Sequence, residues 1–143
     1  MKPENKKKRI VVIDGQGGGL GRSVTEQVKK EWPDAEITAV GTNSAATAAM
    51  LKAGADIGAT GENAVVYNSR SADLILGPLG ICLSGAMHGE ISPAMAASVC
   101  ESPALKLLVP VSKCNARIIG VGEKNMTQHV AEIIAELRDF YGA

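Results

Sequence analysis

The sequence predicts an α/β fold: a doubly wound, mostly parallel sheet of five to six strands with helices on both faces. Short runs rich in Ile, Val and Leu alternate with helical patterns along the 143 residues, as they do in βαβ units. The clearest run is continuous rather than alternating with polar residues, which indicates a strand buried on both faces. Glycine or proline follows several of the runs, where a strand would turn into a helix.

The first strand and helix frame a loop with five glycines. Residues 10–13 read Ile-Val-Val-Ile, and the five glycines fall within residues 15–21, here called the glycine loop. Apolar side chains then recur every fourth residue, at Leu20, Val24, Val28 and Trp32. The glycine loop is therefore expected at the N-terminus of the first helix, where backbone N–H groups and the helix dipole attract anions.

Five further β segments complete the predicted sheet. They cover residues 36–40, 55–59, 72–76, 105–109 and 117–121. Gly41, Gly77 and Pro110 directly follow three of them. Only seven residues separate the last two segments, whereas a parallel crossover needs about a dozen or more. The sixth strand is therefore expected to be an antiparallel partner at the edge of the sheet.

Two short helices are expected between the second and fourth strands. Residues 44–53 are mostly alanine, threonine and methionine, and Thr42, Asn43 or Ser44 could cap this helix. A second helix is expected over residues 60–70. The small side chains of the first of these helices would allow close approach to the sheet, a ligand or another subunit.

Two longer helical regions are expected after the fourth strand. The first follows Pro78, breaks near Gly89 and restarts at Ser92 and Pro93, a good cap followed by a proline at the first helical position. The second covers residues 126–141 and is the clearest helical pattern in the chain. Its expected apolar face consists of Met126, Val130, Ile133, Ile134, Leu137 and Phe140.

The composition fits one domain of ordinary size. Residues 1–9 are expected to form a flexible polar tail with a basic run, and residues 10–143 a single domain. Apolar residues make up 45% and aromatic residues 3% of the chain, so aliphatic side chains must build the core. The net charge is zero and no basic face with interleaved aromatic residues occurs, which argues against a nucleic-acid partner.

Neither a signal peptide nor a membrane span is expected. The basic tail is followed by only four apolar residues before Asp14, and the longest apolar stretch, residues 74–87, is too short for a bilayer. The cysteines Cys82, Cys100 and Cys114 are odd in number and lack C-x-x-C spacing, so a disulfide framework is not expected. These features predict a cytoplasmic protein without a membrane partner.

The spacing of the loop glycines favours a nucleotide without identifying one. Gly15, Gly19 and Gly21 have the spacing found in short-chain dehydrogenases. The pattern G-x-G-x-x-G fails because Leu20 and Arg22 stand where its last glycine would fall. A P-loop is excluded because the chain has no Gly-Lys-Ser/Thr. The alternative is that the glycines only permit a tight turn and close packing of helix on sheet.

Two further motifs of dinucleotide enzymes are missing. Residues 40–44 read Val-Gly-Thr-Asn-Ser, without the acid that would hold ribose hydroxyls about 20 residues after the loop. This absence disfavours NAD and leaves NADP or a mononucleotide open. The Tyr-x-x-x-Lys pair of a short-chain dehydrogenase fails as well, since Ser71 stands four residues after Tyr67.

The carboxyl ends of the strands form the candidate binding site, because open α/β sheets bind ligands there. The loops at this edge are rich in glycine, hydroxyl and amide groups, which suit ribose, phosphate or base. The expected cofactor-binding residues are Asp14, Gly15, Gln16, Gly17, Gly18, Gly19, Leu20, Gly21, Thr42, Asn43, Gly77 and Pro78. Asp14 is equally well explained as a ribose or metal ligand and as an acceptor that shapes the turn.

A few side chains could carry chemistry. Cys114 has Lys113 beside it and Cys82 falls in the first turn of a predicted helix, so either thiol could have a lowered pKa. His88 and Glu90 flank a predicted helix break and could act as acid or base. Cysteines that are buried or incidental are nevertheless commoner than catalytic ones. No group of His, Cys and carboxylate residues has metal-ligand spacing.

Six segments in this order carry a resemblance to a known family: residues 12–21, 41–43, 58–64, 77–81, 89–91 and 114–115. Together they are similar to an uncharacterised family of short bacterial proteins, mainly from clostridia and related anaerobes, that is known as a domain of unknown function. The resemblance extends over almost everything after Arg9. It implies a small, stand-alone cytoplasmic protein with a Rossmann-like fold, and it brings no activity, substrate or catalytic residue with it.

Three functions are compatible with these residues. The first is a nucleotide- or dinucleotide-binding protein with phosphate on the glycine loop; NAD(P), an adenine nucleotide or a coenzyme A derivative could be the ligand. The second is a small enzyme that acts on a phosphorylated or carboxylated metabolite through Cys114, Cys82, His88 or Glu90. The third is an oligomeric scaffold or subunit with a purely structural loop. The small helix at residues 45–53 and the modest core of a short chain also predict a homo-oligomer.

Overall fold

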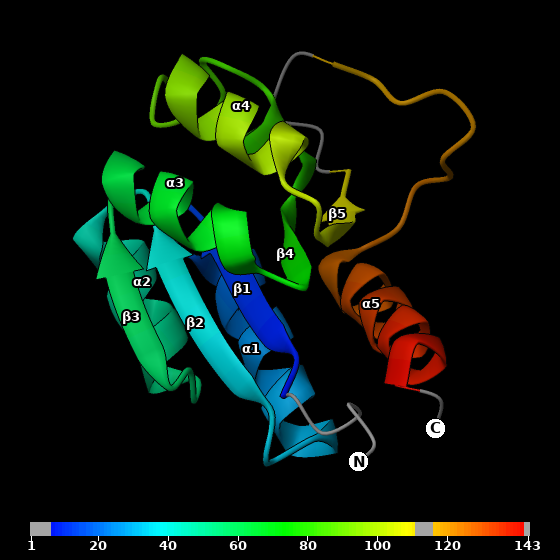
Figure 1. The fold of residues 1–143 in the computed structure, drawn as a ribbon. Helices are drawn as coiled ribbons and strands as arrows, with labels where there is room; N and C mark the ends of the chain where they lie inside the picture. Colours follow the sequence, from blue (N-terminus) through cyan, green and yellow to red (C-terminus); the bar gives the residue numbers. More distant parts are fainter. Residues whose placement is uncertain (1–6, 111–115, 142–143) are drawn as a thin grey trace.

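The computed structural model describes residues 7–110 and 116–141. They form a five-stranded parallel sheet in the order β3-β2-β1-β4-β5, with helices on both faces (Figure 1). The strands are β1 (Arg9–Asp14), β2 (Glu36–Gly41), β3 (Ile57–Thr60), β4 (Leu74–Pro78) and β5 (Leu105–Val109). The helices are α1 (Gly19–Glu31), α2 (Ser44–Lys52), α3 (Glu62–Ser71), the short 3-10 helix η1 (Leu79–Cys82), α4 (Pro93–Glu101) and α5 (Met126–Tyr141). The predicted doubly wound, Rossmann-like α/β fold is confirmed.

The core consists of two apolar layers, one on each face of the sheet. Side chains of β1 alternate between them. Ile10 and Val12 pack with α1, α2 and α5, whereas Val11 and Ile13 pack with α3, η1 and α4. Because both faces of β1 are covered, its sequence shows no alternation with polar residues.

The strand order reverses between β1 and β4. The chain runs from β1 to β2 and β3 on one side, and then returns to β4 and β5 on the other. The carboxyl ends of β1 and β4 are therefore the switch point at which open sheets bind ligands. The glycine loop follows β1 at this point and leads directly into α1.

Residues 117–121, predicted to be an antiparallel edge strand, form no strand. The last strand is β5, which pairs in parallel with β4. Gly120 has a φ of +91°, which breaks the extended conformation that a ladder requires. Ile119 is 92% exposed, so the apolar run is not anchored in the core. The prediction of an antiparallel sixth strand is therefore wrong.

The prediction of a long helix directly after Pro78 is also wrong. Only the single tight turn η1 forms, and turns follow it as far as Ile91. Positive φ angles at Gly85, Met87 and His88 are incompatible with a right-handed helix in this segment. The apolar composition of the segment instead serves a compact connection that packs on the sheet.

Helix starts elsewhere follow the predicted caps. Ser92 caps α4, since its Oγ accepts a hydrogen bond from the Met95 N–H at 3.2 Å, and Pro93 is the first helical residue. Asn43 caps α2 by accepting the Ala46 N–H at 2.9 Å. These two boundaries depend only on local chemistry, which the sequence contains in full.

Helix α5 matches the predicted apolar face in its central turns. Val130, Ile133, Ile134 and Leu137 are buried against the α1 face of the sheet. Met126 is exposed instead, and its sulfur lies 3.6 Å from the Ser23 hydroxyl. No helix in the part of the chain that the structure describes is long and apolar enough to cross a membrane.

The first strand begins within the predicted tail. Arg9 belongs to β1, and its N–H donates to the Asp73 carboxylate at 2.7 Å. Residues 1–6 lie outside the described residues, so most of the predicted tail stays a prediction.

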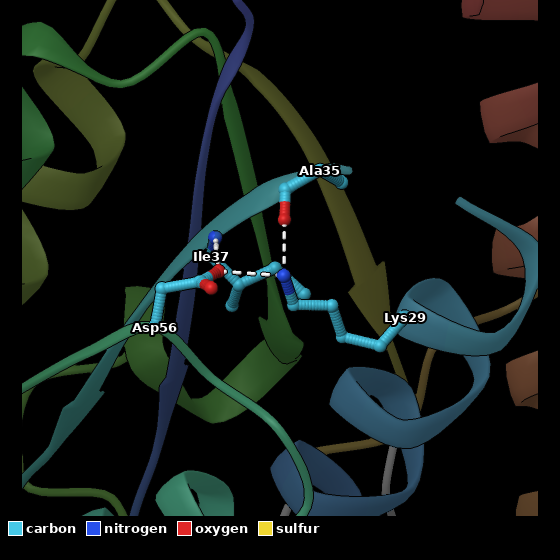
Figure 2. A network of polar contacts seen from close by, with 4 residues as sticks. All are labelled: Lys29, Ala35, Ile37 and Asp56. Carbon is cyan, nitrogen blue, oxygen red and sulfur yellow. Dashed lines mark hydrogen bonds and ion pairs between the residues drawn. The ribbon is translucent and has the colours of Figure 1, made fainter. Parts of the chain in front are cut away.

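A polar network holds the C-terminal end of α1, the end away from the glycine loop (Figure 2). Lys29 contacts the Asp56 carboxylate at 2.8 Å and donates to the Ala35 carbonyl at 2.5 Å. Asp56 also accepts the Ile37 N–H at 2.8 Å. Burial acts to raise the pKa of Asp56, but its bonds to Lys29 and Ile37 outweigh burial and hold the pKa below its ordinary value. The network ties the C-terminal turn of α1 to the start of β2.

Candidate functional site

Asp14 organises the glycine loop from within. Its side chain is 5% exposed, and its two oxygens each accept a backbone hydrogen bond, from the N–H groups of Gly15 and Gly21, both at 2.7 Å. Burial raises the pKa of Asp14, the two N–H donors oppose this, and the negative charge of Glu90 adds to the rise. Of the two interpretations of Asp14, these contacts support the one in which it shapes the turn.

Close packing explains two of the loop glycines. Gly18 has a φ of +72°, and a Cβ there would lie 2.9 Å from the Ala46 Cα of α2. A Cβ at Gly21 would lie 2.5 Å from the Met50 sulfur. These glycines therefore allow α1 and α2 to pack side by side, which is the structural alternative considered for the loop.

Two other glycines of the loop, Gly17 and Gly19, have no such packing role. Among the described residues, the N–H groups of Gly17, Gly19 and Leu20 donate to no acceptor. Gly19 and Leu20 begin α1, whose first turn contains no acidic residue. A Cβ at Gly17 would meet nothing within 4 Å, and one at Gly19 would meet only the Met126 Cε at 4.0 Å. Free donors, the positive end of the helix dipole and open space coincide here, as an anion requires.

Glu90 lies between the glycine loop and the end of β2. Its Oε1 accepts hydrogen bonds from the Thr42 hydroxyl at 2.7 Å and the Asn43 side-chain amide at 2.6 Å. The Gln16 N–H donates to both carboxylate oxygens, at 3.2 and 3.1 Å. Burial acts to raise the pKa of Glu90, but these three donors and the nearby His88 lower it overall. The carboxylate is therefore ionised at neutral pH beside the loop.

A strained turn over residues 85–91 carries Glu90 to this position. Three consecutive residues have positive φ angles: Met87 at 58°, His88 at 57° and Gly89 at 92°. A left-handed conformation costs a residue other than glycine about 1–2 kcal/mol. The Gly85 N–H closes the turn by donating to the Ile91 carbonyl at 2.7 Å. Strain of this kind persists only where the surroundings fix it, and it clusters at ligand-binding and switch regions.

The structure brings together candidate residues from three separate loops. Gln16 comes from the glycine loop, Thr42 and Asn43 follow β2, and Glu90 precedes α4. Asn43 links all three, because its amide donates to the Gln16 carbonyl at 2.9 Å as well as to Glu90. The sequence predicts Glu90 as an acid or base, and it does not predict that Glu90 lies at the end of β2.

Gly77 has a packing role at the end of β4, and Pro78 is the last residue of that strand. A Cβ at Gly77 would lie 2.3 Å from the Ile13 carbonyl oxygen, so only glycine lets β4 approach β1 this closely. Both residues are buried, and neither has a side chain that could hydrogen-bond a ligand. Their assignment to cofactor binding stays a prediction.

Met87 makes a contact that the sequence analysis missed. A Cβ at Gly15 would lie 2.5 Å from the Met87 sulfur and 2.6 Å from the Thr42 hydroxyl. The glycine at position 15 is thus required by side chains from two other loops. No spacing in the sequence signals this contact, because the left-handed turn alone brings Met87 over the glycine loop.

Cys82, the candidate catalytic cysteine that the structure describes, lacks the features of an activated thiol. Burial, and then the neighbouring Cys100 thiol, raise the pKa of Cys82 to about 12 despite the opposing charge of Lys106. Cys82 is therefore protonated at neutral pH, and the single turn of η1 does not supply the predicted helix. His88 is exposed on the strained turn, and Cys114 lies outside the described residues. Among the residues that the structure describes, no group of three or more His, Cys, Asp or Glu side chains could hold a metal ion.

Residues 9–141 match the family model described as "Domain of unknown function (DUF3842)", and the chain belongs to this family. A comparison with curated proteins finds no match. The chain is similar to a crystal structure of a dodecameric, FMN-dependent UbiX-like decarboxylase from Escherichia coli O157:H7. That likeness has a TM-score of 0.49 and 16% sequence identity, and it covers 95% of each chain.

Proposed function

We propose that this protein binds a nucleotide or dinucleotide and holds a phosphate of that ligand on the glycine loop. The observation that carries the proposal is that the N–H groups of Gly17, Gly19 and Leu20 have no acceptor among the described residues, at the start of a helix without an acidic first turn. An anion at this position would accept hydrogen bonds from these donors and interact favourably with the helix dipole. The location at the carboxyl end of β1, beside the switch point, supports the same proposal.

The ligand class follows from the groups around the loop. Thr42 and Asn43 carry hydroxyl and amide groups at the neighbouring strand end, and Gln16 lies exposed in the loop itself. The Thr42 hydroxyl and the Asn43 amide already donate to Glu90, so they would act on a ligand through that carboxylate, whereas the exposed Gln16 side chain could contact it directly. NAD(P), an adenine nucleotide and a coenzyme A derivative are the candidate ligands. The proposal includes no reaction, because no observation among the described residues favours catalysis by Cys82 or His88.

A substitution at Gly19 tests the proposal, because folding and binding should respond in opposite directions. An aspartate at the first helical position should raise the free energy of unfolding by about 0.3–1 kcal/mol through the helix dipole. The same charge should repel a phosphate and weaken binding by about tenfold to a hundredfold. The measurement is a thermal-shift screen with inorganic pyrophosphate, ADP, NAD⁺, NADP⁺, FMN and coenzyme A, followed by calorimetry of any ligand found.

Gly19→Asn is the matched control, since it has nearly the same shape as Gly19→Asp without the charge. The asparagine variant should bind more tightly than the aspartate variant and should lack its dipole stabilisation. Equal affinities of wild type and Gly19→Asp for a ligand would contradict a phosphate at this loop. Failure of every probe to shift the melting temperature would contradict nucleotide binding altogether and favour a structural loop.

The protein is further proposed to act in the cytoplasm as a homo-oligomer. Cys82 and Cys100 are free thiols, as is usual in a reducing compartment. Ile57 is 48% exposed on the β3 edge of the sheet and Leu105 is 47% exposed on the β5 edge. Apolar side chains on an open strand edge favour contact with a second copy.

A further inference from the structure

We propose that Glu90 is the ribose-binding acid of this protein and that it selects a free 2′-hydroxyl against a 2′-phosphate. The inference rests on the proposed nucleotide binding and adds a specificity to it. It assigns to a residue before α4 the role that dinucleotide-binding folds give to an acid at the end of their second strand.

The position of the carboxylate is the first argument. Residues 42–44, which follow β2, contain no acid. In the folded chain, Thr42 and Asn43 of this segment both donate to Glu90 Oε1, at 2.7 and 2.6 Å. Glu90 thus brings a negative charge to the end of β2, where the sequence alone shows none.

The link to the phosphate site is the second argument. Gln16, whose N–H donates to Glu90, directly precedes Gly17, the first residue with a free N–H. The Glu90 carboxylate therefore lies one residue along the loop from the donors proposed to bind the phosphate, where the ribose next to a 5′-phosphate can reach it.

The remaining acceptor capacity of Glu90 is the third argument. Oε1 already accepts three hydrogen bonds, whereas Oε2 accepts only the Gln16 N–H at 3.1 Å among the described residues. A carboxylate has about four acceptor sites over its two oxygens, and Oε2 keeps a free one. Glu90 is half-buried, so this oxygen is reachable by a ligand. A ribose hydroxyl can donate to it, and a 2′-phosphate, which has only a negative charge to offer, cannot.

The strained turn supplies the fourth argument. A flexible surface glutamate would lose side-chain entropy on binding, whereas the positive φ angles at Met87, His88 and Gly89 fix the backbone that carries Glu90. Met87 anchors the turn on Gly15, and four hydrogen bonds hold the carboxylate. The acid is therefore preorganised before any ligand arrives.

The test compares pairs of ligands that differ only at the 2′ position. Calorimetry measures the affinity of the wild-type protein for NAD⁺ and NADP⁺, and for ADP and 2′-deoxy-ADP. A hydroxyl bonded to a charged acceptor should make ADP bind roughly tenfold to a hundredfold more tightly than 2′-deoxy-ADP. NAD⁺ should likewise bind more tightly than NADP⁺.

Glu90→Gln keeps the size of the side chain and removes its charge, so both preferences should shrink by at least about tenfold. Glu36→Gln is the matched control, because Glu36 is an exposed acid at the opposite end of β2. It should leave both ratios unchanged. Circular dichroism of both variants checks that each one is folded.

The outcomes separate this inference from the proposal on which it rests. If ADP and 2′-deoxy-ADP bind equally well, or NADP⁺ binds better than NAD⁺, the assignment of Glu90 is wrong and nucleotide binding stands. If Glu90→Gln binds all four ligands and pyrophosphate more tightly by one common factor, the Glu90 carboxylate only repels anions from the loop and is not a ribose acceptor. If none of the four ligands binds, the assignment of Glu90 is wrong, and nucleotide binding is wrong as well if the other probes of the thermal-shift screen also fail.

Discussion

Two carboxylates lie at the glycine loop, and their surroundings give them different capacities. Asp14 is almost fully buried, and both of its oxygens are used by the N–H groups of Gly15 and Gly21. Glu90 is half-buried and keeps one oxygen with a free acceptor site. Both residues stand out in the sequence. Their roles could not be separated there, because the turn that places Glu90 depends on left-handed conformations that the sequence does not signal.

Cys82 makes the stability of the protein sensitive to alkaline pH. The unfolded thiol ionises near its ordinary pKa, whereas burial raises the pKa of the folded thiol to about 12. Above the ordinary pKa the unfolded chain releases a proton that the native chain keeps, so the free energy of unfolding should fall as the pH rises toward 12. Urea unfolding of wild type and Cys82→Ala between neutral and alkaline pH measures this dependence.

The Cys82→Ala variant should show a shallower decline than the wild type. Burial also raises the pKa of Tyr141, which contributes to the decline of both proteins and cancels in the comparison. Parallel curves for the two proteins would mean that the Cys82 thiol is not protected from ionisation in the native state.

At the scale of elements, Gly77 sets the distance between β1 and β4. A Cβ there would lie 2.3 Å from the Ile13 carbonyl oxygen, which is backbone and cannot move aside cheaply. Gly77→Ala should therefore lower the free energy of unfolding by about 3 kcal/mol or more. Chemical denaturation measures this change.

Gly17→Ala is the matched control for Gly77→Ala. A Cβ at Gly17 would meet nothing within 4 Å, and the φ of this residue is not positive. Its free energy of unfolding should stay within about 0.5 kcal/mol of wild type. If both variants had the same stability, Gly77 would not be a packing requirement at the switch point.

The elements that the sequence predicts correctly are those whose signals are local. The cap at Ser92 and the apolar face of α5 need only residues within the same helix. The two errors concern segments that contain residues with positive φ angles, at Gly120 and in the turn over residues 85–91. An apolar run that contains a glycine is equally compatible with a strand, a helix or a packed turn.

At the scale of the whole molecule, the two open edges of the sheet bear on oligomerisation. The wild-type chain, with a mass of 14.8 kDa, should sediment as a larger species at micromolar concentration. Ile57→Lys or Leu105→Lys should shift it toward the monomer, because a charge at a paired strand edge opposes association. Tyr67→Lys is the control, since Tyr67 is exposed on α3 rather than on a strand edge. A wild-type monomer under these conditions would rule out the homo-oligomer.

The fold class could be predicted because alternating strands and helices leave few arrangements, and an α/β sheet gathers its loops at one edge. The same rule predicts from the sequence that Gln16, Thr42 and Asn43 share one candidate site. The acid at that site could not be predicted as such. Glu90 is 47 or 48 residues from its partners Asn43 and Thr42, and only the tertiary structure joins them.

The central claim, a phosphate on the glycine loop, is tested most directly by mapping backbone amide signals during a titration. ADP and inorganic pyrophosphate are added separately to ¹⁵N-labelled protein, and the amide shifts of all assigned residues are followed to saturation. The account predicts that both ligands shift Gly17, Gly19 and Leu20 most strongly. Ile37 and Asp56, in the network at the far end of α1, should stay unchanged. Saturable binding that leaves the three loop amides unmoved, or no binding of either ligand, would contradict the claim.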